Sequence, residues 1–465
     1  MNQNPPRINW RERKALGFTF KRGIHPKEQK QFTENVPIEV LLPVAGSEVV
    51  YPLLQHLGEP CKPLVEKGQK VLLGEKIGDS DAFFCAPVHT SVSGVVKDIR
   101  PHMTVVGTIV DSIIIENDGE LTEHESIKLR DSFDDLSREQ ILAIIREAGI
   151  VGLGGAGFPT HVKLSPPPGK KIDTIILNGC ECEPYLTTDN RIMIEEAKPI
   201  VTGLQIVLKV LREAKDAVPV KGVIAIEDNK PEAIEALKKA SAGIPDIEVV
   251  VVKTKYPQGA EKQLIYAVTK REVPSGGLPM DVGCIVNNVD TIIAIHRSIL
   301  RGRPLMRKVV TLTGGAIAKP GNYKARIGTK LGDLVEQAGG FKAEPRKIVV
   351  GGPMMGTAIF DIDVPIVKTT AGVLFLTEEE AYIPPEQKCI RCAACVEHCP
   401  AGLIPTELSA DILKEDGEAF VEHNGLDCIE CGSCSYICPA KKRLAQAIRT
   451  IRRIELAKLK NKSKS

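Results

Sequence analysis

The sequence predicts a multidomain α/β protein, in which a small β module precedes an α/β layered domain and a cysteine-rich C-terminal domain. Short β-branched runs separated by Gly, Pro and Asp fill residues 36–117, a spacing typical of small all-β modules. Apolar runs then alternate with helical patterns between residues 136 and 304, as in layered α/β domains. Eight of the 13 cysteines lie in two copies of one motif between residues 389 and 439.

Length and composition limit the class of protein. The 465 residues correspond to about three domains at ~150 residues each, and 43 % hydrophobic residues are enough for real cores. The formal net charge of +2 argues against a nucleic-acid-binding protein. No apolar run approaches about 18 residues and residues 1–30 are polar, so we expect neither a membrane span nor a signal peptide. Cysteines outside the repeated motif fit a reducing cytoplasm.

The first β-rich segment predicts a barrel or a sandwich, with strands at 38–42, 71–73, 92–96 and 109–115. Residues 86–96 resemble the β-sandwich hybrid of lipoyl and biotinyl carriers. The lysine that carries the swinging group in those proteins is absent, so we interpret the segment as a structural module. Residues 119–135 are acidic and turn-rich, and they are a plausible linker.

A glycine-rich loop follows a helix that Ser137 is expected to cap, with apolar residues on one face. The loop contains Gly152, Gly154, Gly155 and Gly157, followed by Phe158. Glycine lets the backbone approach a ligand closely and present N–H groups to a phosphate. The loop is not the dinucleotide-binding fingerprint, because a helix precedes it and not a strand. It predicts a site for a phosphate-bearing cofactor.

A second candidate site follows the apolar run at 172–177, which predicts a buried strand. Asn178, Glu181 and Glu183 come directly after it, at the end of the strand where ligands of open α/β sheets bind. Two carboxylates and an amide are costly if merely buried, so we expect them to contact a polar ligand. Cys180 and Cys182 are interpreted as small loop residues. Further strands are expected at 222–227 and 247–253, and helices at 191–217 and 231–240.

The repeated motif is C-x-x-C-x-x-C-x-x-x-C-P, the spacing of bacterial ferredoxins that bind two [4Fe–4S] clusters. The first copy supplies Cys389, Cys392, Cys395 and Cys399, and the second supplies Cys428, Cys431, Cys434 and Cys438. In two-cluster ferredoxins the fourth cysteine of each copy ligates the other cluster. We therefore expect Cys438 to join the first three cysteines, and Cys399 to join the second set. Paired C-x-x-C motifs also bind zinc, but zinc gives no reason to repeat this unit.

Several segments carry a family resemblance. Residues 152–163, 178–184, 259–261 and 286–291 resemble the flavin-binding NADH dehydrogenase subunit of respiratory complex I, and 309–360 resemble its β-grasp (SLBB) module. The ferredoxin-type pair and the preceding β module depart from that subunit. Their combination resembles the C subunits of Rnf complexes, the ion-pumping ferredoxin:NAD oxidoreductases of bacteria and archaea. The likeness covers nearly the whole chain.

The resemblance implies an N-terminal β barrel-sandwich hybrid, an α/β flavin- and NADH-binding domain, an SLBB-like β-grasp module and a C-terminal two-cluster ferredoxin-like α-helical domain. The implied divisions are an N-terminal segment at 1–35, the hybrid at 36–118, the flavin domain at 136–304, the β-grasp module at 305–372, the ferredoxin-type domain at 380–440 and a basic amphipathic tail at 441–465.

The resemblance also implies which residues hold FMN and NAD(H). They are Gly152, Gly154, Gly155, Gly157, Phe158, Lys163, Asn178, Glu181, Glu183, Glu261, Asn287 and Asn288. Lys163 would neutralise the phosphate, the two carboxylates after the strand would border flavin and dinucleotide, and Phe158 would stack on adenine. In place of a second stacking aromatic the chain has Pro166, and the loop at 275–281 is shorter than its counterpart.

The implied activity is hydride exchange between NAD(H) and FMN, with single electrons passing through two [4Fe–4S] clusters, and no side chain need act as a base. The implied partners are a ferredoxin-like B subunit and integral membrane subunits, at the cytoplasmic face of the cell membrane. The tail carries ten Lys and Arg residues and one acid. It predicts either a solvated helix packed on the ferredoxin-type domain or a basic surface for a partner or anionic lipid.

Two other functions fit the same architecture. One is a soluble NADH-dependent cobalamin reductase of a bacterial microcompartment, which is similar to the Rnf C subunit. The other is an electron wire or scaffold whose flavin site has decayed, against which the complete glycine-rich loop speaks.

Overall fold

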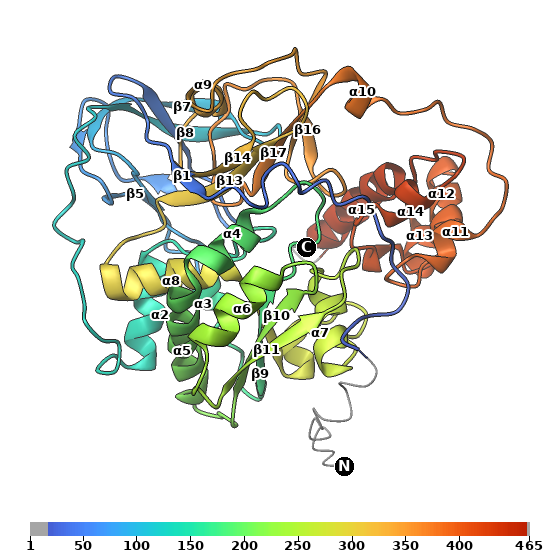
Figure 1. The fold of residues 1–465 in the computed structure, drawn as a ribbon, viewed down its shortest axis with the longest axis horizontal. Coiled ribbons are helices and arrows are strands. Elements are labelled where there is room, and N and C mark those ends of the chain that lie inside the picture. Colours follow the sequence, from blue (N-terminus) through green and yellow to red (C-terminus); the bar gives the residue numbers. More distant parts are fainter. Residues whose placement is uncertain (1–16, 463–465) are drawn as a thin grey trace.

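The computed structural model describes residues 17–462, so most of the first half of the 1–35 segment and the last three residues of the tail lie outside it. Along the chain, a β sandwich, an α/β domain, a second mixed sheet and a small helical domain follow one another (Figure 1). Within the described residues, no helix is both long enough and apolar enough to cross a membrane.

The N-terminal module is a sandwich of two sheets, with strand orders β2-β8-β7-β4 and β3-β5-β6. Its strands are β2 (Glu48–Pro52), β3 (Lys62–Pro63), β4 (Lys70–Val71), β5 (Lys76–Asp79), β6 (Val88–His89), β7 (Gly94–Met103) and β8 (Ile109–Asn117). Buried side chains such as Val49, Ile77 and Ile113 fill the space between the sheets. The predicted barrel-sandwich architecture is present.

The α/β domain has a parallel sheet in the order β11-β10-β9-β12. Its elements are α2 (Arg138–Glu147), α3 (Thr160–Lys163), β9 (Thr174–Gly179), α4 (Thr188–Glu195), α5 (Ala197–Arg212), β10 (Lys221–Glu227), α6 (Pro231–Ala240), β11 (Ile247–Val252), α7 (Glu261–Thr269), η1 (Pro279–Val282), β12 (Cys284–Asn288) and α8 (Val289–Arg301). Alternate residues of β9 face opposite layers: Ile175 and Leu177 pack with α2, α5 and α8, whereas Ile176 packs with α7. Helices therefore cover both faces of the sheet.

A separate mixed sheet has six strands in the order β1-β14-β13-β17-β15-β16. Its elements are β1 (Ile38–Val40), β13 (Arg307–Thr313), β14 (Gly321–Arg326), α9 (Leu331–Gln337), β15 (Lys347–Val350), β16 (Thr357–Ile359) and β17 (Gly372–Leu376). The assignment of the 38–42 strand to the N-terminal module is wrong, because β1 pairs in parallel with β14. A β-branched pattern predicts a strand, but it does not identify the sheet that the strand joins.

The C-terminal domain is helical, as predicted. It contains α11 (Ala394–Glu397), α12 (Pro405–Leu413), α13 (Gly417–Glu422), η2 (Gly425–Asp427), α14 (Ser433–Ile437) and α15 (Leu444–Lys462), and α10 (Glu378–Ala381) precedes it. Leu444, Ile448 and Ile451 of the basic tail are buried, the last two against Leu408 and Phe420. The apolar side of the tail helix is thus used within the domain, which agrees with the first of the two predictions for the tail.

The N-terminal segment from residue 17 to 36 runs as a strap along the α/β domain and beside the helical domain (Figure 1). Phe18 bridges to Val252 and Ile24 bridges to Tyr256, while the backbone N–H of Gly23 donates to the carbonyl of His398. The strap therefore holds the two domains together. Nothing in its polar sequence indicated this role.

Candidate functional site

The predicted cofactor residues converge at the carboxyl edge of the α/β sheet. β9 and β12 lie side by side and parallel, with Asn178 opposite Asn288 in the register. The chain leaves β9 in one direction to reach β10 and returns on the other side at β12, so the strand order reverses here. Such switch points open a crevice at the carboxyl ends of the strands, where ligands of open α/β sheets bind.

The glycine-rich loop joins α2 to α3 over this edge. A Cβ added to Gly154 would lie 2.8 Å from Nδ2 of Asn288, so the close packing requires glycine there. A Cβ added to Gly155 would meet no described atom within 4 Å, and the backbone at this point is exposed. At Gly155 the loop is thus open to solvent, so its backbone is accessible to a ligand such as a phosphate.

Two further predicted residues form an ion pair beside the loop. Lys163 Nζ lies 3.1 Å from Oε1 of Glu261 and donates to the carbonyl of Val286 at 2.9 Å. Lys163 comes from the end of α3 and Glu261 from the start of α7. The ammonium group is held at the edge of β12, where it can balance a bound phosphate.

The three predicted amides differ in how much of their hydrogen-bonding capacity is free. Asn178 donates to the carbonyl of Gly259 at 2.8 Å and accepts from the backbone of Cys180, so it organises the loop after β9. Asn288 donates to Asp189 and caps α8 by accepting from Asp290 N. Asn287 is 3 % exposed, and its Nδ2 has no hydrogen-bond partner among the described residues. A buried donor without a partner is unfavourable, so Asn287 fits a ligand with an acceptor.

Glu181 contacts the start of the following helix, and its predicted role beside the cofactors stays a prediction. Its carboxylate accepts from the backbone N–H groups of Asp189 at 2.6 Å and Asn190 at 3.2 Å, at the N-terminus of α4. The carboxylate pairs with backbone amides that the helix leaves without a partner, and the positive end of the helix dipole stabilises its negative charge. Burial raises the pKa of Asp189, and the neighbouring Glu181 carboxylate raises it further.

Glu183 points to the junction with the other domains. It accepts from the backbone N–H groups of Met354 at 3.1 Å and Met355 at 3.0 Å, both in the β-grasp module. Its Oε1 also lies 3.3 Å from the hydroxyl of Tyr256, which donates to the carbonyl of Cys431 at 2.8 Å. Burial raises the pKa of Glu183 to about 7.

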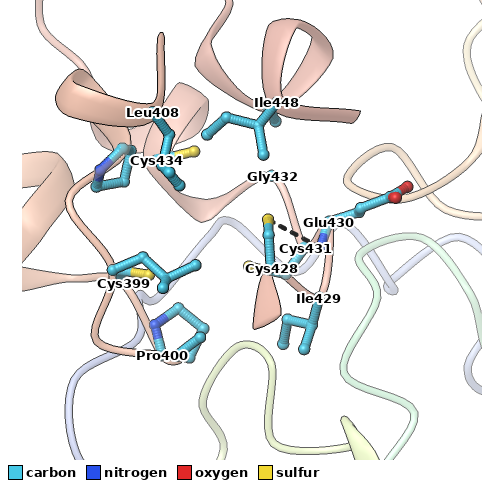
Figure 2. Close-up of a pocket in the computed structure, with 14 residues that line it drawn as sticks. Cys399, Pro400, Leu408, Cys428, Ile429, Glu430, Cys431, Gly432, Cys434 and Ile448 are labelled. Carbon is cyan, nitrogen blue, oxygen red and sulfur yellow. Dashed lines mark hydrogen bonds between the residues drawn. The ribbon is translucent and has the colours of Figure 1, made fainter. Parts of the chain in front are cut away.

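One set of four cysteines lines a single cavity in the helical domain (Figure 2). We call these residues the inner cysteine set: Cys399, Cys428, Cys431 and Cys434. Glu430 and Gly432 adopt positive φ angles of 56° and 78°, which turn the loop tightly around the cavity. Burial raises the pKa of the Cys434 thiol to about 12, and nearby Cys431, Cys428 and Cys399 contribute.

The remaining four cysteines form the outer cysteine set: Cys389, Cys392, Cys395 and Cys438. Burial raises the pKa of Cys395, and the adjacent Cys438 and Cys392 add to the effect. Arg391 and Ala393 repeat the positive φ angles of the inner loop, at 55° and 60°. The backbone N–H of Arg391 lies 3.4 Å from Cys389 Sγ, and that of Glu430 lies 3.4 Å from Cys428 Sγ. Cys399 lies in the cavity of the second motif, and the crossed ligation of the two clusters stays a prediction.

The inner set lies against the rest of the protein. Cys431 packs in an apolar cluster with Ile24 and Tyr256, and Cys182 from the loop after β9 borders it. Cys389 and Cys392 of the outer set are exposed. One cluster site thus lies against the predicted flavin domain, and the other faces solvent.

Sequence reasoning missed three residues that shape this region. Lys30, in the strap, is 6 % exposed and donates to the carbonyls of Glu181, Glu183 and Leu186, which fixes the loop after β9. Gln258 is fully buried, and neither its amide nitrogen nor its oxygen has a hydrogen-bond partner within the part of the chain that the structure describes. Tyr256 links the cluster loop to Glu183. For Gln258 and Tyr256, the only signal in the sequence was their position beside the motif at 259–261.

Comparison with known proteins matches four families in the order of the predicted domains. They are the RnfC barrel sandwich hybrid domain at 18–120, the Nuo51 FMN-binding domain at 145–297, the SLBB domain at 309–358 and the 4Fe-4S dicluster domain at 383–443. The C subunit of the proton-translocating ferredoxin:NAD(+) oxidoreductase complex of Clostridium ljungdahlii is 48 % identical, over 93 % of both chains. The chain belongs to the RnfC family.

Other members of the RnfC family are nearly as similar. The C subunit of the Na(+)-translocating ferredoxin:NAD(+) oxidoreductase complex of Acetobacterium woodii is 46 % identical, over 94 % of this chain and 96 % of its own. The C subunit of an ion-translocating oxidoreductase complex from Haemophilus influenzae is 40 % identical over 87 % of this chain but only 61 % of its own length. The predicted fold class and the cofactors, FMN and two [4Fe–4S] clusters, agree with these matches. The dicluster match rules out the zinc interpretation of the repeated motif.

Proposed function

We propose that this chain is the peripheral electron-transfer subunit of an ion-translocating ferredoxin:NAD+ oxidoreductase complex. The names of its RnfC relatives support this assignment. The main observation behind the proposal is the contact between the two cofactor regions. The loop after β9 and the inner cysteine set share one apolar cluster around Tyr256. The buried side chains of Ile24, Tyr256 and Cys431 form this junction.

The residues at the sheet edge fit FMN. The space at Gly155 would receive the phosphate, Lys163 would supply a positive charge, and the free Nδ2 of Asn287 would donate to an acceptor of the cofactor. When bound, FMN takes two electrons from a hydride donor and releases them singly, which matches it to the one-electron clusters. The role of the protein residues is to hold and orient it.

The proposed dinucleotide site includes an aromatic pair whose two rings come from distant parts of the sequence. The rings of Phe158 and Phe84 lie 6.0 Å apart in an edge-on arrangement, and Phe84 comes from the N-terminal module. Phe84 is 48 % exposed. It would serve as the second adenine-contacting aromatic that Pro166 does not provide.

The outer cysteine set would exchange electrons with the partner subunits. Cys389 and Cys392 are exposed, and so is Ile390 between them, at 69 %. Exposed cluster ligands with an exposed apolar residue between them suit a docking surface for a redox partner. We place a ferredoxin-like B subunit there, with integral membrane subunits beyond it, and the whole chain at the cytoplasmic face of the membrane.

An anaerobic titration tests this function. The purified chain, with its clusters and added FMN, is mixed with NADH while flavin absorption and the cluster signal in electron paramagnetic resonance are followed. We expect flavin bleaching, then cluster reduction. Flavin that binds but stays oxidised would refute the dinucleotide site, and absence of flavin binding would refute the assignment of the sheet edge. A parallel assay that supplies NADH and a corrinoid, and measures corrinoid reduction, separates the cobalamin reductase alternative.

A further inference from the structure

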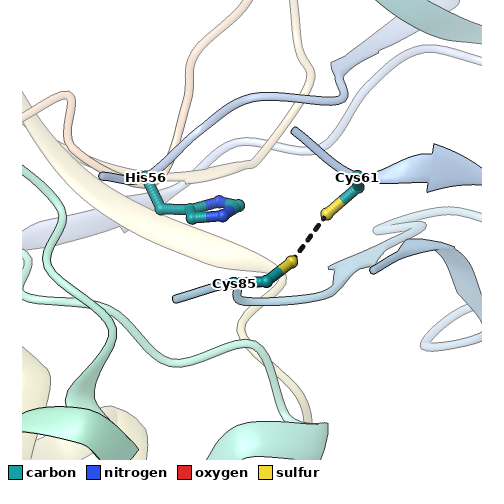
Figure 3. Close-up of side chains that lie close together, drawn as sticks. All are labelled: His56, Cys61 and Cys85. Carbon is teal, nitrogen blue, oxygen red and sulfur yellow. Dashed lines mark hydrogen bonds between the residues drawn. The ribbon is translucent and has the colours of Figure 1, made fainter. Parts of the chain in front are cut away.

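Three buried side chains of the N-terminal module converge away from the cofactor residues described above. His56, Cys61 and Cys85 each offer a ligand atom, and these atoms lie within 4.8 Å of one another (Figure 3). Exposure of the residues is 8 %, 5 % and 0 % respectively. His56 and Cys61 lie between β2 and β3, and Cys85 precedes β6, so the fold brings the three together from two separate segments. Among the described residues, no other group of three or more such side chains meets this criterion.

The distance between the two sulfurs suits a metal better than a covalent bond. Sγ of Cys61 lies 3.6 Å from Sγ of Cys85. A disulfide brings the sulfurs to about 2.05 Å. Two thiolates on a tetrahedral zinc ion, each at about 2.3 Å from the metal, lie about 3.8 Å apart. The sulfurs are therefore spaced close to one edge of a zinc tetrahedron.

His56 has a free nitrogen inside the protein. Its Nε2 lies 3.1 Å from the carbonyl of Glu59, which can only accept a hydrogen bond. With the proton on Nε2, the lone pair is left on Nδ1, which is buried and has no partner within residues 17–462. The other tautomer, in which Nε2 accepts from the Ala86 amide at 3.3 Å, would leave a buried Nδ1–H donor unpaired. Metal-bound histidines commonly donate their second nitrogen to a backbone carbonyl in this way.

We propose that His56, Cys61 and Cys85 bind one Zn²⁺ ion through two sulfurs and one imidazole nitrogen. Two thiolates and one imidazole form a ligand set that zinc favours over Mg²⁺ or Ca²⁺, which prefer oxygen. Two thiolates also balance the charge of the ion. This ion is separate from the iron clusters, whose eight cysteines lie in the C-terminal domain.

The position of the site indicates what the metal does. The backbone N–H of Leu57 donates to the carbonyl of Gly157 at 3.1 Å, and a Cβ on Gly157 would lie 3.2 Å from Cα of His56. Phe84, next to Cys85, contacts Phe158. A zinc ion would therefore fix two segments of the N-terminal module that form a wall of the glycine-rich loop.

Metal analysis of the full chain tests the site. The protein is prepared anaerobically with its clusters filled, supplied with Zn²⁺, passed over a desalting column, and measured for zinc and iron by mass spectrometry of the elements. We expect one zinc per chain in the wild type. Cys85→Ser and Cys61→Ser should lose the zinc and keep the iron. Cys284→Ser, which removes a buried free thiol of the α/β domain, should keep both and is the matched control.

X-ray absorption at the zinc edge gives a readout that stoichiometry cannot. We expect two sulfur neighbours and one imidazole, and His56→Gln should remove the imidazole signal even if a cysteine variant does not fold. Wild type that retains no zinc, or serine variants that retain it fully, would overturn the proposal. A Cys61–Cys85 disulfide that forms with peroxide in protein exposed to zinc would also overturn it, and would identify a redox pair instead.

Discussion

Two neighbouring glycines, Gly154 and Gly155, should respond differently to alanine. In Gly154→Ala the new methyl group lies 2.8–3.0 Å from the side chain of Asn288, which is held by Asp189 and caps α8. Forced overpacking of this kind costs about 1–3 kcal/mol. For a domain of ~150–250 residues this lowers the melting temperature by about 2–12 °C. The defect should already be present in protein without FMN.

Gly155→Ala has no such neighbour among residues 17–462, and its φ angle lies outside the left-handed region. The free energy of unfolding should stay level or rise by about 0.4–1 kcal/mol, because alanine restricts the unfolded chain. If the space at Gly155 receives phosphate, however, the methyl group occupies it. A loss of about 1–3 kcal/mol would then weaken FMN binding about 5- to 150-fold.

Two measurements separate these effects. Thermal unfolding of the FMN-free protein should show a defect only in Gly154→Ala. Quenching of flavin fluorescence should show weak FMN binding in Gly155→Ala despite its normal melting. FMN affinity equal to wild type in Gly155→Ala would show that the loop does not cradle the phosphate, and normal melting of Gly154→Ala would show that the contact with Asn288 is relaxed without cost.

Other positions carry sharp expectations. Cys399→Ala should remove the cluster beside the flavin domain, so that NADH bleaches the flavin without reducing the cluster that remains. Cys438→Ala should leave the inner cluster reducible. Electron paramagnetic resonance distinguishes the two variants, and the reverse pattern would contradict the crossed ligation. Burial raises the pKa of Glu183 to about 7, so its contribution to stability is present below about pH 4 and is lost as pH rises to about 7. Glu183→Gln removes this ionisation, so its melting temperature should change less between pH 4 and pH 8 than that of wild type, and an unchanged pH dependence would show that the carboxylate is well solvated.

Local patterns in the sequence were sufficient for many elements. The helix at Ser137 forms with the predicted cap, because the Ser137 hydroxyl accepts from Gln140 N and the Gln140 side chain accepts from Ser137 N. The strand at 172–177 and the helix Pro231–Ala240 were also predicted within a few residues. Cysteine spacing fixes the cluster loops because the ligands lie close together in the chain.

Long-range contacts account for what the sequence did not reveal. The β-branched run at 38–42 predicts a strand, but only folding decides that it pairs with β14, almost 300 residues later. Lys30 has no motif around it, and its role depends on three carbonyls beyond residue 180. Glu181 follows a strand, but nothing in that position indicated that its carboxylate also accepts from the first turn of α4. A sequence shows which polar groups a side chain carries, but it does not show which other groups in the fold will contact them.

Asn287 provides a further test of this distinction, because its donor has no partner among the described residues. Asn287→Leu keeps the side-chain size and removes a buried, unpaired donor that costs about 1–3 kcal/mol. FMN-free protein should melt at the same or a higher temperature. FMN affinity should fall about 2- to 12-fold, which corresponds to a hydrogen bond of about 0.5–1.5 kcal/mol.

Asn178→Leu is the matched control, since both polar atoms of Asn178 hold the backbone. That variant should lower the melting temperature of FMN-free protein, because it leaves the carbonyl of Gly259 and the amide of Cys180 without their partner. If Asn287→Leu instead melts lower and binds FMN normally, its amide has a structural role like that of Asn178. If it behaves as expected, the apo protein tolerates an unpaired buried donor at a position that a ligand completes. A binding site would then be identifiable from a buried polar group that folding leaves unsatisfied.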